Sequence, residues 1–166
     1  HVSGHFREDP LRVLRGMQFV ARFGLEPHPS TVGLCRKMSI ENLPPERLME
    51  EWKKFLLKGR WMSRGLDFLR RTGWVHHFPE LSRLIGCKQD PEWHPEGDVW
   101  NHTALTINNL RHGHDWVDVM IALFHDAGKK RALERNSGKN MAGHEMIGLP
   151  LAEAVLDNFG FKKHEK

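Results

Sequence analysis

Apolar residues recur at helical spacing through almost the whole chain, and glycine or proline interrupts the pattern at short intervals. The first helix is expected to open at Asp9 and Pro10, an acidic N-cap followed by proline in the first turn, and to stop before Gly24. No segment alternates apolar and polar residues as a half-buried strand does. The sequence therefore predicts an all-α fold. Further helices are expected over residues 30–38, 46–58, 61–72, 80–85, 99–110, 116–124 and 149–159.

Two stretches break the helical pattern. Residues 87–98 carry two prolines and a glycine and are expected to form an ordered loop, with Asp98 as the N-cap of the next helix. Residues 127–142 are polar and rich in glycine and basic side chains, so a loop or a partly helical segment is expected there. The first of these stretches divides the chain near residue 87.

Composition limits the class of protein. Charged residues make up 28% and hydrophobic residues 39% of the 166 residues, as in a soluble globular chain of one domain or two small ones. We find no run of about 18 apolar residues, so no membrane contact is predicted. The two cysteines form no CxxC pair and are too few for a disulfide scaffold, which favours a cytoplasmic protein. The 12 histidines direct attention to metal ligands and acid–base chemistry.

The net charge of +4 is unevenly distributed. Residues 1–86 contain 15 Lys and Arg against 9 Asp and Glu, a net charge of +6, whereas residues 87–166 contain 10 against 12, a net charge of −2. A polyanion therefore suits the first half and not the second. Solvated helix faces are the simpler explanation for such charge counts.

A metal-ligand pattern occurs in the second half. His102 is expected one turn inside a helix, and His125 and Asp126 at the end of the next one. Two antiparallel helices can bring such side chains together inside a bundle, where imidazole and carboxylate ligands suit a divalent metal. Water bound to the metal would then be a nucleophile near neutral pH, as in phosphate ester hydrolysis. The pattern alone equally fits a core histidine next to a capping aspartate.

The surrounding residues strengthen the metal hypothesis. The segment HDAGK is followed by GHEMIG, and WHPEGDVWNHT lies upstream; together they resemble the HD-domain phosphohydrolase superfamily. The resemblance implies that His102, His125 and Asp126 bind Ni²⁺, Mn²⁺ or Mg²⁺, with His125 and Asp126 catalytic and His144 a further ligand. In that superfamily a distal aspartate on a later helix completes the site. Here only Asp157 follows, so a longer protein is expected.

A second resemblance begins at the N-terminal end. The segment EDPLRVLRGMQFVARFG resembles the EDxxR region of class II tRNA nucleotidyltransferases, which are CCA-adding enzymes, and of bacterial poly(A) polymerases. The phrase LPPERLMEEWKKFL is similar to the next helices of that family. The order FPEL, QDPEWHPEGDVWNHT and LFHDAGK resembles its multifunctional form, in which an HD domain follows the transferase. The resemblance covers about residues 6–160.

The family likeness implies a nucleotide-binding role for one side-chain pair. Asp9 and Arg12 would form a template that reads the base of the incoming nucleotide, with Glu8 and Arg15 as supports. On a helix these two residues share a face, and their acceptors and donors can pair with a base edge. Gly16 is expected to leave room for a flat ring. A helix cap with a local salt bridge is the simpler interpretation of EDxxR alone.

The resemblance also implies the wider function. Residues 1–86 would be the neck and body module and residues 87–166 an HD domain truncated at its C-terminal end. The parent protein would add CCA to tRNA 3′ ends from CTP and ATP with Mg²⁺, and its HD domain would hydrolyse phosphomonoesters or 2′,3′-cyclic phosphates. The family's transferase head, with its paired carboxylates, precedes EDxxR, so this chain alone is not expected to transfer nucleotides.

Three alternatives remain open at this stage. The first is a poly(A) polymerase with the same body. The second is a stand-alone HD phosphohydrolase with a helical RNA-binding front. The third is a non-catalytic RNA-binding or scaffold module with a vestigial metal site. The oligomeric state is not predicted.

Overall fold

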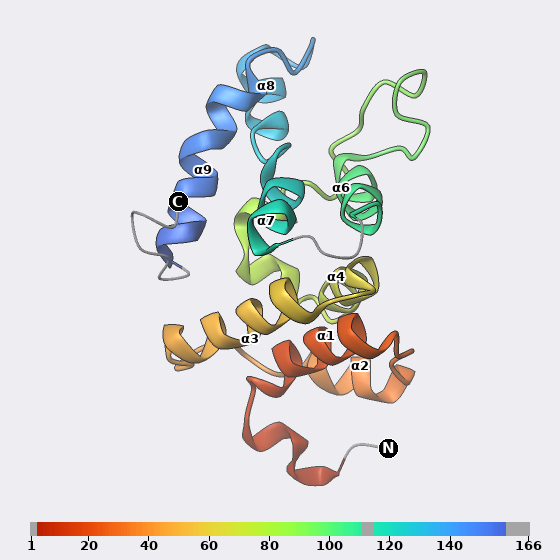
Figure 1. The fold of residues 1–166 in the computed structure, drawn as a ribbon, viewed down its shortest axis with the longest axis vertical. Coiled ribbons are helices and arrows are strands. Elements are labelled where there is room, and N and C mark those ends of the chain that lie inside the picture. Colours follow the sequence, from red (N-terminus) through yellow and green to blue (C-terminus); the bar gives the residue numbers. More distant parts are fainter. Residues whose placement is uncertain (1–2, 111–114, 159–166) are drawn as a thin grey trace. The chain divides into compact units, whose positions relative to one another are not determined.

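The computed structural model describes residues 3–110 and 115–158 (Figure 1). Within these ranges the regular structure is helical, and the only strand-like pairing is a single bridge between Lys88 and Asp98. The all-α prediction is therefore confirmed. The chain divides into two compact units, of which the first ends at His77 and the second begins at Phe78. The boundary predicted between functional modules, at residues 86 and 87, stays a prediction.

The first unit packs three amphipathic helices together. Helix α1 contacts both α3 and α4, and most of the buried side chains of these helices are apolar, with Gln18 and Glu51 as polar exceptions. Gly24 ends α1 in the left-handed conformation, as predicted, and its N–H donates to the carbonyl of Val20. The elements are η1 (Gly4–Glu8), α1 (Arg12–Phe23), α2 (Pro29–Cys35), α3 (Pro45–Lys58), α4 (Met62–Arg71) and η2 (Trp74–His77).

Glycines let α1 and α4 approach closely. A Cβ atom on Gly65 of α4 would lie 2.9 Å from the Cβ of Ala21 and 3.0 Å from the carbonyl oxygen of Met17. A Cβ atom on Gly16 of α1 would lie 3.0 Å from the Phe68 ring. The space that Gly16 leaves is thus filled by a ring of the protein's own core, which corrects the expectation that it receives a ligand.

The start of α1 also differs from the prediction. The helix begins at Arg12, because the turn before it is closed by bonds three residues apart: the N–H groups of Arg12 and Val13 donate to the carbonyl oxygens of Asp9 and Pro10. One carboxylate oxygen of Asp9 accepts from the N–H of Leu11, and the other accepts from Arg47. Asp9 therefore stabilises a turn before the helix rather than its first turn.

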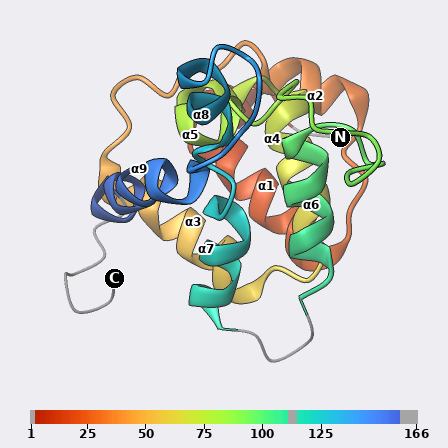
Figure 2. The same cartoon turned by 90° about the horizontal axis from the view of Figure 1, so that it is seen from above.

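The second unit is built around α7, which lies between α6 and α9 (Figures 1 and 2). Asp98 and Asp115 cap α6 and α7, as predicted, and Asp118 completes a capping box with Asp115. The elements are α5 (Pro79–Ser82), α6 (Val99–Asn108), α7 (Trp116–Phe124), α8 (Lys129–Arg135) and α9 (His144–Asn158). No helix in the described ranges is long and apolar enough to cross a membrane.

The last two helices meet at a pair of glycines. A Cβ atom on Gly128 would lie 2.0 Å from the carbonyl oxygen of His144 and 2.6 Å from the nitrogen of Gly148. Only glycine permits this approach of α9 to the segment after α7. Helix α9 begins five residues earlier than predicted, and the C-terminal end expected at residue 159 lies outside the described residues.

Candidate metal centre

Three predicted histidines meet around the carboxylate of Asp126, which is itself a predicted ligand. His102 lies on α6, His125 is the C-cap of α7, Asp126 follows it, and His144 is the first residue of α9. The Nε2 atoms of His125 and His102 lie 3.2 Å and 3.8 Å from Oδ2 of Asp126. The Nε2 atom of His144 lies 3.4 Å from Oδ1. We call these four residues the Asp126 cluster.

The three imidazoles of the cluster share one orientation. Nδ1 of His125 lies 3.0 Å from the carbonyl oxygen of Ala122, and Nδ1 of His144 lies 3.0 Å from that of Met141. Nδ1 of His102 lies 2.6 Å from the carboxylate of Glu96. Carbonyl and carboxylate oxygens only accept hydrogen bonds, so each Nδ1 position calls for a proton there. In the neutral ring the Nε2 lone pair then faces Asp126.

Lone pairs of nitrogen that converge on a carboxylate repel it unless a cation lies between them. A proton can serve, and the facing Asp126 raises the pKa of His125 above its ordinary value. A divalent metal can also serve, since imidazole nitrogen and carboxylate oxygen are its usual ligands. His102, His125 and Asp126 offer ligand atoms that all lie within 4.8 Å of one another.

The carboxylate itself is deeply buried. Asp126 is 2% exposed, and although burial alone would raise its pKa, the facing His125 and Lys129 lower that pKa to about 2. Nζ of Lys129 lies 2.8 Å from Oδ2, and it also donates to the side chain of Gln89 at 2.5 Å. No donor in the described part of the chain meets hydrogen-bond geometry toward that oxygen. A buried carboxylate oxygen with free acceptor capacity, next to three imidazoles, fits a divalent metal.

Two further side chains close to the cluster in the sequence differ in their surroundings. Lys129, which directly follows the segment HDAG, is 7% exposed and ion-paired with Asp126. Asp157 is exposed near the end of α9, and no group of potential metal ligands within residues 3–110 and 115–158 includes it. The cluster thus comprises the four predicted residues, with Lys129 as an internal counter-charge.

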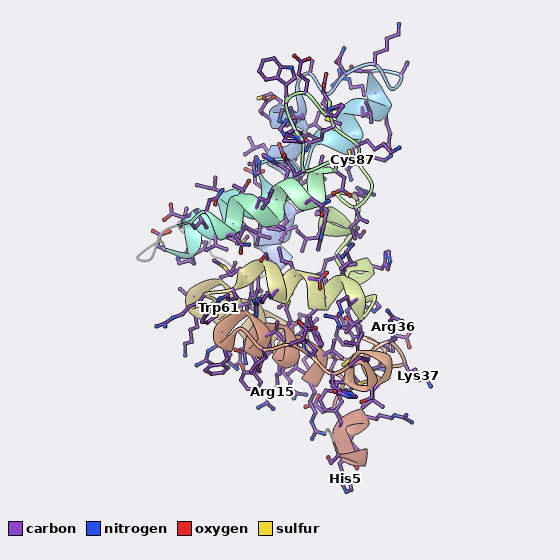
Figure 3. The ribbon with its side chains drawn as sticks, turned by 90° about the vertical axis from the view of Figure 1, so that its right-hand side faces the viewer. His5, Arg15, Arg36, Lys37, Trp61 and Cys87 are labelled. Atoms are coloured by element: carbon purple, nitrogen blue, oxygen red, sulfur yellow. The ribbon has the colours of Figure 1, made fainter. Side chains whose placement is uncertain are left out.

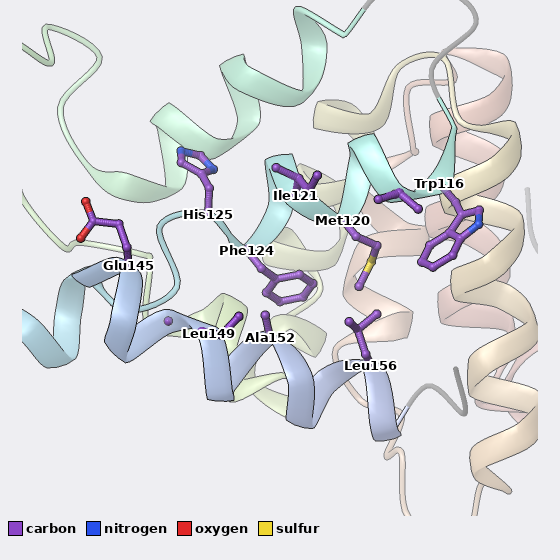
Figure 4. Close-up of a pocket in the computed structure, with 11 residues that line it drawn as sticks. Trp116, Met120, Ile121, Phe124, His125, Glu145, Leu149, Ala152 and Leu156 are labelled. Carbon is purple, nitrogen blue, oxygen red and sulfur yellow. The ribbon is translucent and has the colours of Figure 1, made fainter. Parts of the chain in front are cut away.

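An apolar cavity of about 390 Å³ opens beside the cluster between α7 and α9. His125 and Glu145 lie at one end of it and Trp116 and Leu156 at the other (Figure 4). The walls between them are aliphatic and aromatic. His125 is thereby the one member of the cluster on the cavity wall.

The predicted nucleotide-binding residues occupy the N-terminal part of the first unit. The carboxylate of Asp9 pairs with Arg47 of α3 at 2.9 Å, and Arg12 donates to the carbonyl oxygen of His5. Glu8 faces the imidazole of His5 at 2.5 Å, and Arg15 is exposed on α1 (Figure 3). Asp9 and Arg12 thus have separate partners in the free protein, and a template built from both needs Asp9 to exchange its partner.

Most cations of the first unit are engaged with the protein itself. Arg70 and Arg71 pair with Asp67 and Glu26, and Arg64 donates to the carbonyl oxygen of Gly24. Arg36 donates to the carbonyl oxygen of Arg71, and Lys37 is exposed beside it (Figure 3). Several cations of this unit are therefore held by local ion pairs and by bonds to carbonyl oxygens.

Sequence reasoning overlooked the roles of Glu96 and Gln89. Glu96 lies in the loop before α6, and Gln89 lies in the same loop and contacts Lys129, 40 residues away. Glu96 could have been found from the sequence, because it lies in the polar segment WHPEGDVWNHT only six residues before His102. Nothing in the sequence around Gln89 signals its contact.

Comparison with known proteins finds one family model and several similar proteins. Residues 24–85 match the family model described as "Probable RNA and SrmB- binding site of polymerase A". A "Multifunctional CCA protein" of Alkalilimnicola ehrlichii is 37% identical over an alignment that covers 95% of this chain and 40% of that protein. The protein of the same name from Cupriavidus metallidurans is 38% identical over 93% of this chain and 39% of its own length.

The chain belongs to the family of the CCA-adding enzymes and poly(A) polymerases.

A third protein named "Multifunctional CCA protein", from Acinetobacter baumannii, is 38% identical over 78% of this chain and 33% of its own length. The chain thus spans about 40% of the length of the first two relatives. No solved structure matches the chain.

Proposed function

We propose that the second unit is a metal-dependent phosphohydrolase of the HD type. The convergence of three imidazole Nε2 atoms on the buried carboxylate of Asp126 carries this proposal. His102, His125, Asp126 and His144 would hold the ion, and three nitrogen donors favour Mn²⁺ or Ni²⁺ over Mg²⁺. The bound metal would supply a nucleophilic water at neutral pH and polarise the phosphate.

The residues of the chain have separate tasks in such a reaction. The backbone carbonyls of Ala122 and Met141 orient two of the imidazoles. Lys129 keeps Asp126 ionised and adds a positive charge where a phosphoester would bring a negative one. The apolar cavity next to His125 gives one side of the cluster non-polar surroundings. The substrates proposed are phosphomonoesters and 2′,3′-cyclic phosphates.

A metal and activity assay on the full chain tests this proposal. The chain loaded with Mn²⁺, Ni²⁺ or Mg²⁺ is expected to hydrolyse bis-p-nitrophenyl phosphate or 2′,3′-cyclic AMP. His125→Ala is expected to abolish both turnover and metal retention, and His76→Ala, at an exposed histidine of the first unit, is expected to change neither. Absence of turnover together with absence of metal would refute the proposal.

We also propose that the whole protein adds CCA to tRNA 3′ ends from CTP and ATP with Mg²⁺, in the cytoplasm. The shared name of the three relatives and the match of residues 24–85 to an RNA-binding model support this. In this function Asp9 and Arg12 read the base, with Glu8 and Arg15 beside them. The exchange of Asp9 from Arg47 to a nucleotide would accompany binding.

Binding measurements separate this function from that of a poly(A) polymerase. Deacylated tRNA is expected to bind the chain more tightly than poly(A) of equal length, with affinity falling as salt rises. Asp9→Ala and Arg12→Ala are expected to weaken binding of CTP and ATP in the full-length protein but not tRNA binding. Equal affinity for poly(A) would favour the polymerase instead.

A further inference from the structure

His102 differs from the other two imidazoles of the Asp126 cluster in what holds its Nδ1 atom. His125 and His144 face backbone carbonyls from their own turns, three residues away. His102 faces a side chain, the carboxylate of Glu96, at 2.6 Å. Its orientation therefore depends on a residue of the loop before α6 rather than on the helix that carries it.

The carboxylate of Glu96 contacts two histidines. Its Oε1 atom lies 2.6 Å from Nδ1 of His102 and 3.1 Å from Nδ1 of His94. The two rings meet edge to face, with centroids 4.8 Å apart. The Glu96 side chain is 15% exposed, and an ionised carboxylate offers acceptors only. Both Nδ1 atoms therefore direct protons at one oxygen.

Hydrogen bonds within and around the loop hold Glu96 in place. The side chain of Asn101 on α6 donates to the carbonyl oxygen of Glu96 at 3.1 Å. Asp98 binds the N–H of Asn101 with one carboxylate oxygen and the N–H of Gly86 with the other. Gly97 has a φ of +101°, a conformation that side-chain-bearing residues rarely adopt. These contacts tie the loop to the first turn of α6, one turn from His102.

We propose that Glu96, supported by His94, is a positioning residue that holds His102 in the Nδ1–H tautomer and leaves its Nε2 lone pair directed at Asp126. Its consequence for metal binding rests on the proposed phosphohydrolase function. A carboxylate behind a ligating imidazole fixes the ring and increases its basicity, and loss of such a partner lowers metal affinity by about 10- to 100-fold.

The tautomer is measured directly in the metal-free chain. In ¹H–¹⁵N spectra at about pH 8, above the ordinary pKa of histidine, Nδ1 of His102 is expected to carry the proton and Nε2 to be unprotonated. Glu96→Ala is expected to shift this equilibrium toward the Nε2–H form. Glu96→Gln retains an acceptor oxygen and is expected to keep the Nδ1–H form. An Nε2–H tautomer in the wild-type chain would overturn the proposal.

Metal affinity gives the second readout. Glu96→Ala is expected to weaken Mn²⁺ binding about 10- to 100-fold, with Glu96→Gln restoring most of it. Glu92→Ala, at an exposed glutamate of the same loop, is the matched control and is expected to leave the affinity unchanged. Equal affinity of Glu96→Ala and the wild type would refute the positioning role. If the wild-type chain binds no metal, the phosphohydrolase fails, while the tautomer spectrum still decides the role of Glu96.

Discussion

The two units each bury a carboxylate, but they surround it differently. In the first unit Glu51 is buried and meets one cation, the half-exposed Lys54, at 2.9 Å. In the second unit Asp126 is buried and meets a buried lysine and three imidazoles. One arrangement is a local pair within a helix, and the other draws side chains from α6, α7, α8 and α9.

The difference predicts which of the two units a metal ion stabilises. Paired charges near the surface contribute little to stability, so the first unit depends on its apolar core between α1, α3 and α4. A buried convergence of charges costs more desolvation than a single pair recovers, unless a further cation completes it. The second unit is therefore expected to gain stability from a metal ion, and the first is not.

Asp126→Asn is expected to have the largest effect on the metal affinity and stability of the second unit. The substitution retains the shape of the side chain but removes the anionic ligand. Metal affinity is therefore expected to fall by more than about 100-fold, the upper limit for loss of a residue that only supports a ligand. It also leaves the buried Lys129 without its counter-charge, which costs about 3–5 kcal/mol of unfolding free energy. Urea denaturation and Mn²⁺ titration measure the two effects.

Two variants control this result. Glu51→Gln, the matched change in the first unit, is expected to alter stability by less than about 1 kcal/mol, because its partner Lys54 is half-exposed. The double variant Asp126→Asn with Lys129→Met is expected to recover stability without recovering metal binding. Full stability of the single variant Asp126→Asn would show that the Asp126–Lys129 pair does not stabilise the second unit.

The thiols report on each unit separately. Burial raises the pKa of Cys35, in the first unit, to about 11, and burial also raises the pKa of Cys87, in the second. Neither thiol is expected to react with a disulfide reagent near pH 8 unless its unit opens, because a raised pKa leaves little thiolate. Mn²⁺ at about 100 times its dissociation constant is expected to slow labelling of Cys87 about 100-fold and that of Cys35 not at all.

Equal slowing of both cysteines would contradict the comparison, since it would mean that the units open together. The control is His125→Ala, in which Mn²⁺ is expected to leave the labelling rate of Cys87 unchanged.

Local contacts explain which parts of the fold could be predicted. Asp98 and Asp115 cap helices through N–H groups two or three residues away, so the sequence placed those helix starts correctly. Helix α1 begins two residues later than predicted, although the Asp9 carboxylate makes the local bond to the N–H of Leu11 that a cap makes; its contact with Arg47, 38 residues away, could not be predicted. The contents of the space at Gly16 could not be predicted either, because Phe68 comes from another helix.

The candidate site follows the same rule. His102, His125 and Asp126 could be proposed from their positions on and after helices together with the resemblance to HD-domain phosphohydrolases. The burial of Lys129 could not, because it depends on Asp126 and on Gln89 of a distant loop.

Substitutions at two closely packed glycines are expected to have effects of intermediate size. Gly128→Ala is expected to destabilise the second unit by about 1–3 kcal/mol and to weaken metal binding, since its Cβ would displace the backbone of His144. Gly65→Ala is expected to destabilise the first unit by a similar amount but to leave metal affinity intact. Chemical denaturation and Mn²⁺ titration of both variants measure this; unchanged affinity in Gly128→Ala would remove His144 from the ligand set.

Gly33→Ala is expected to have the smallest effect, and in the opposite direction. Gly33 lies inside α2, and a Cβ atom there would meet no other atom within 4 Å. Alanine in a helix interior is favoured over glycine by about 0.5–1 kcal/mol, because glycine loses more backbone entropy on folding. The unfolding free energy of the first unit should rise by that amount, read from slower labelling of Cys35. Labelling of Cys87 and Mn²⁺ affinity should stay constant; a change in either would show that stability gained in the first unit is transmitted to the metal centre, and the two units would then be energetically coupled.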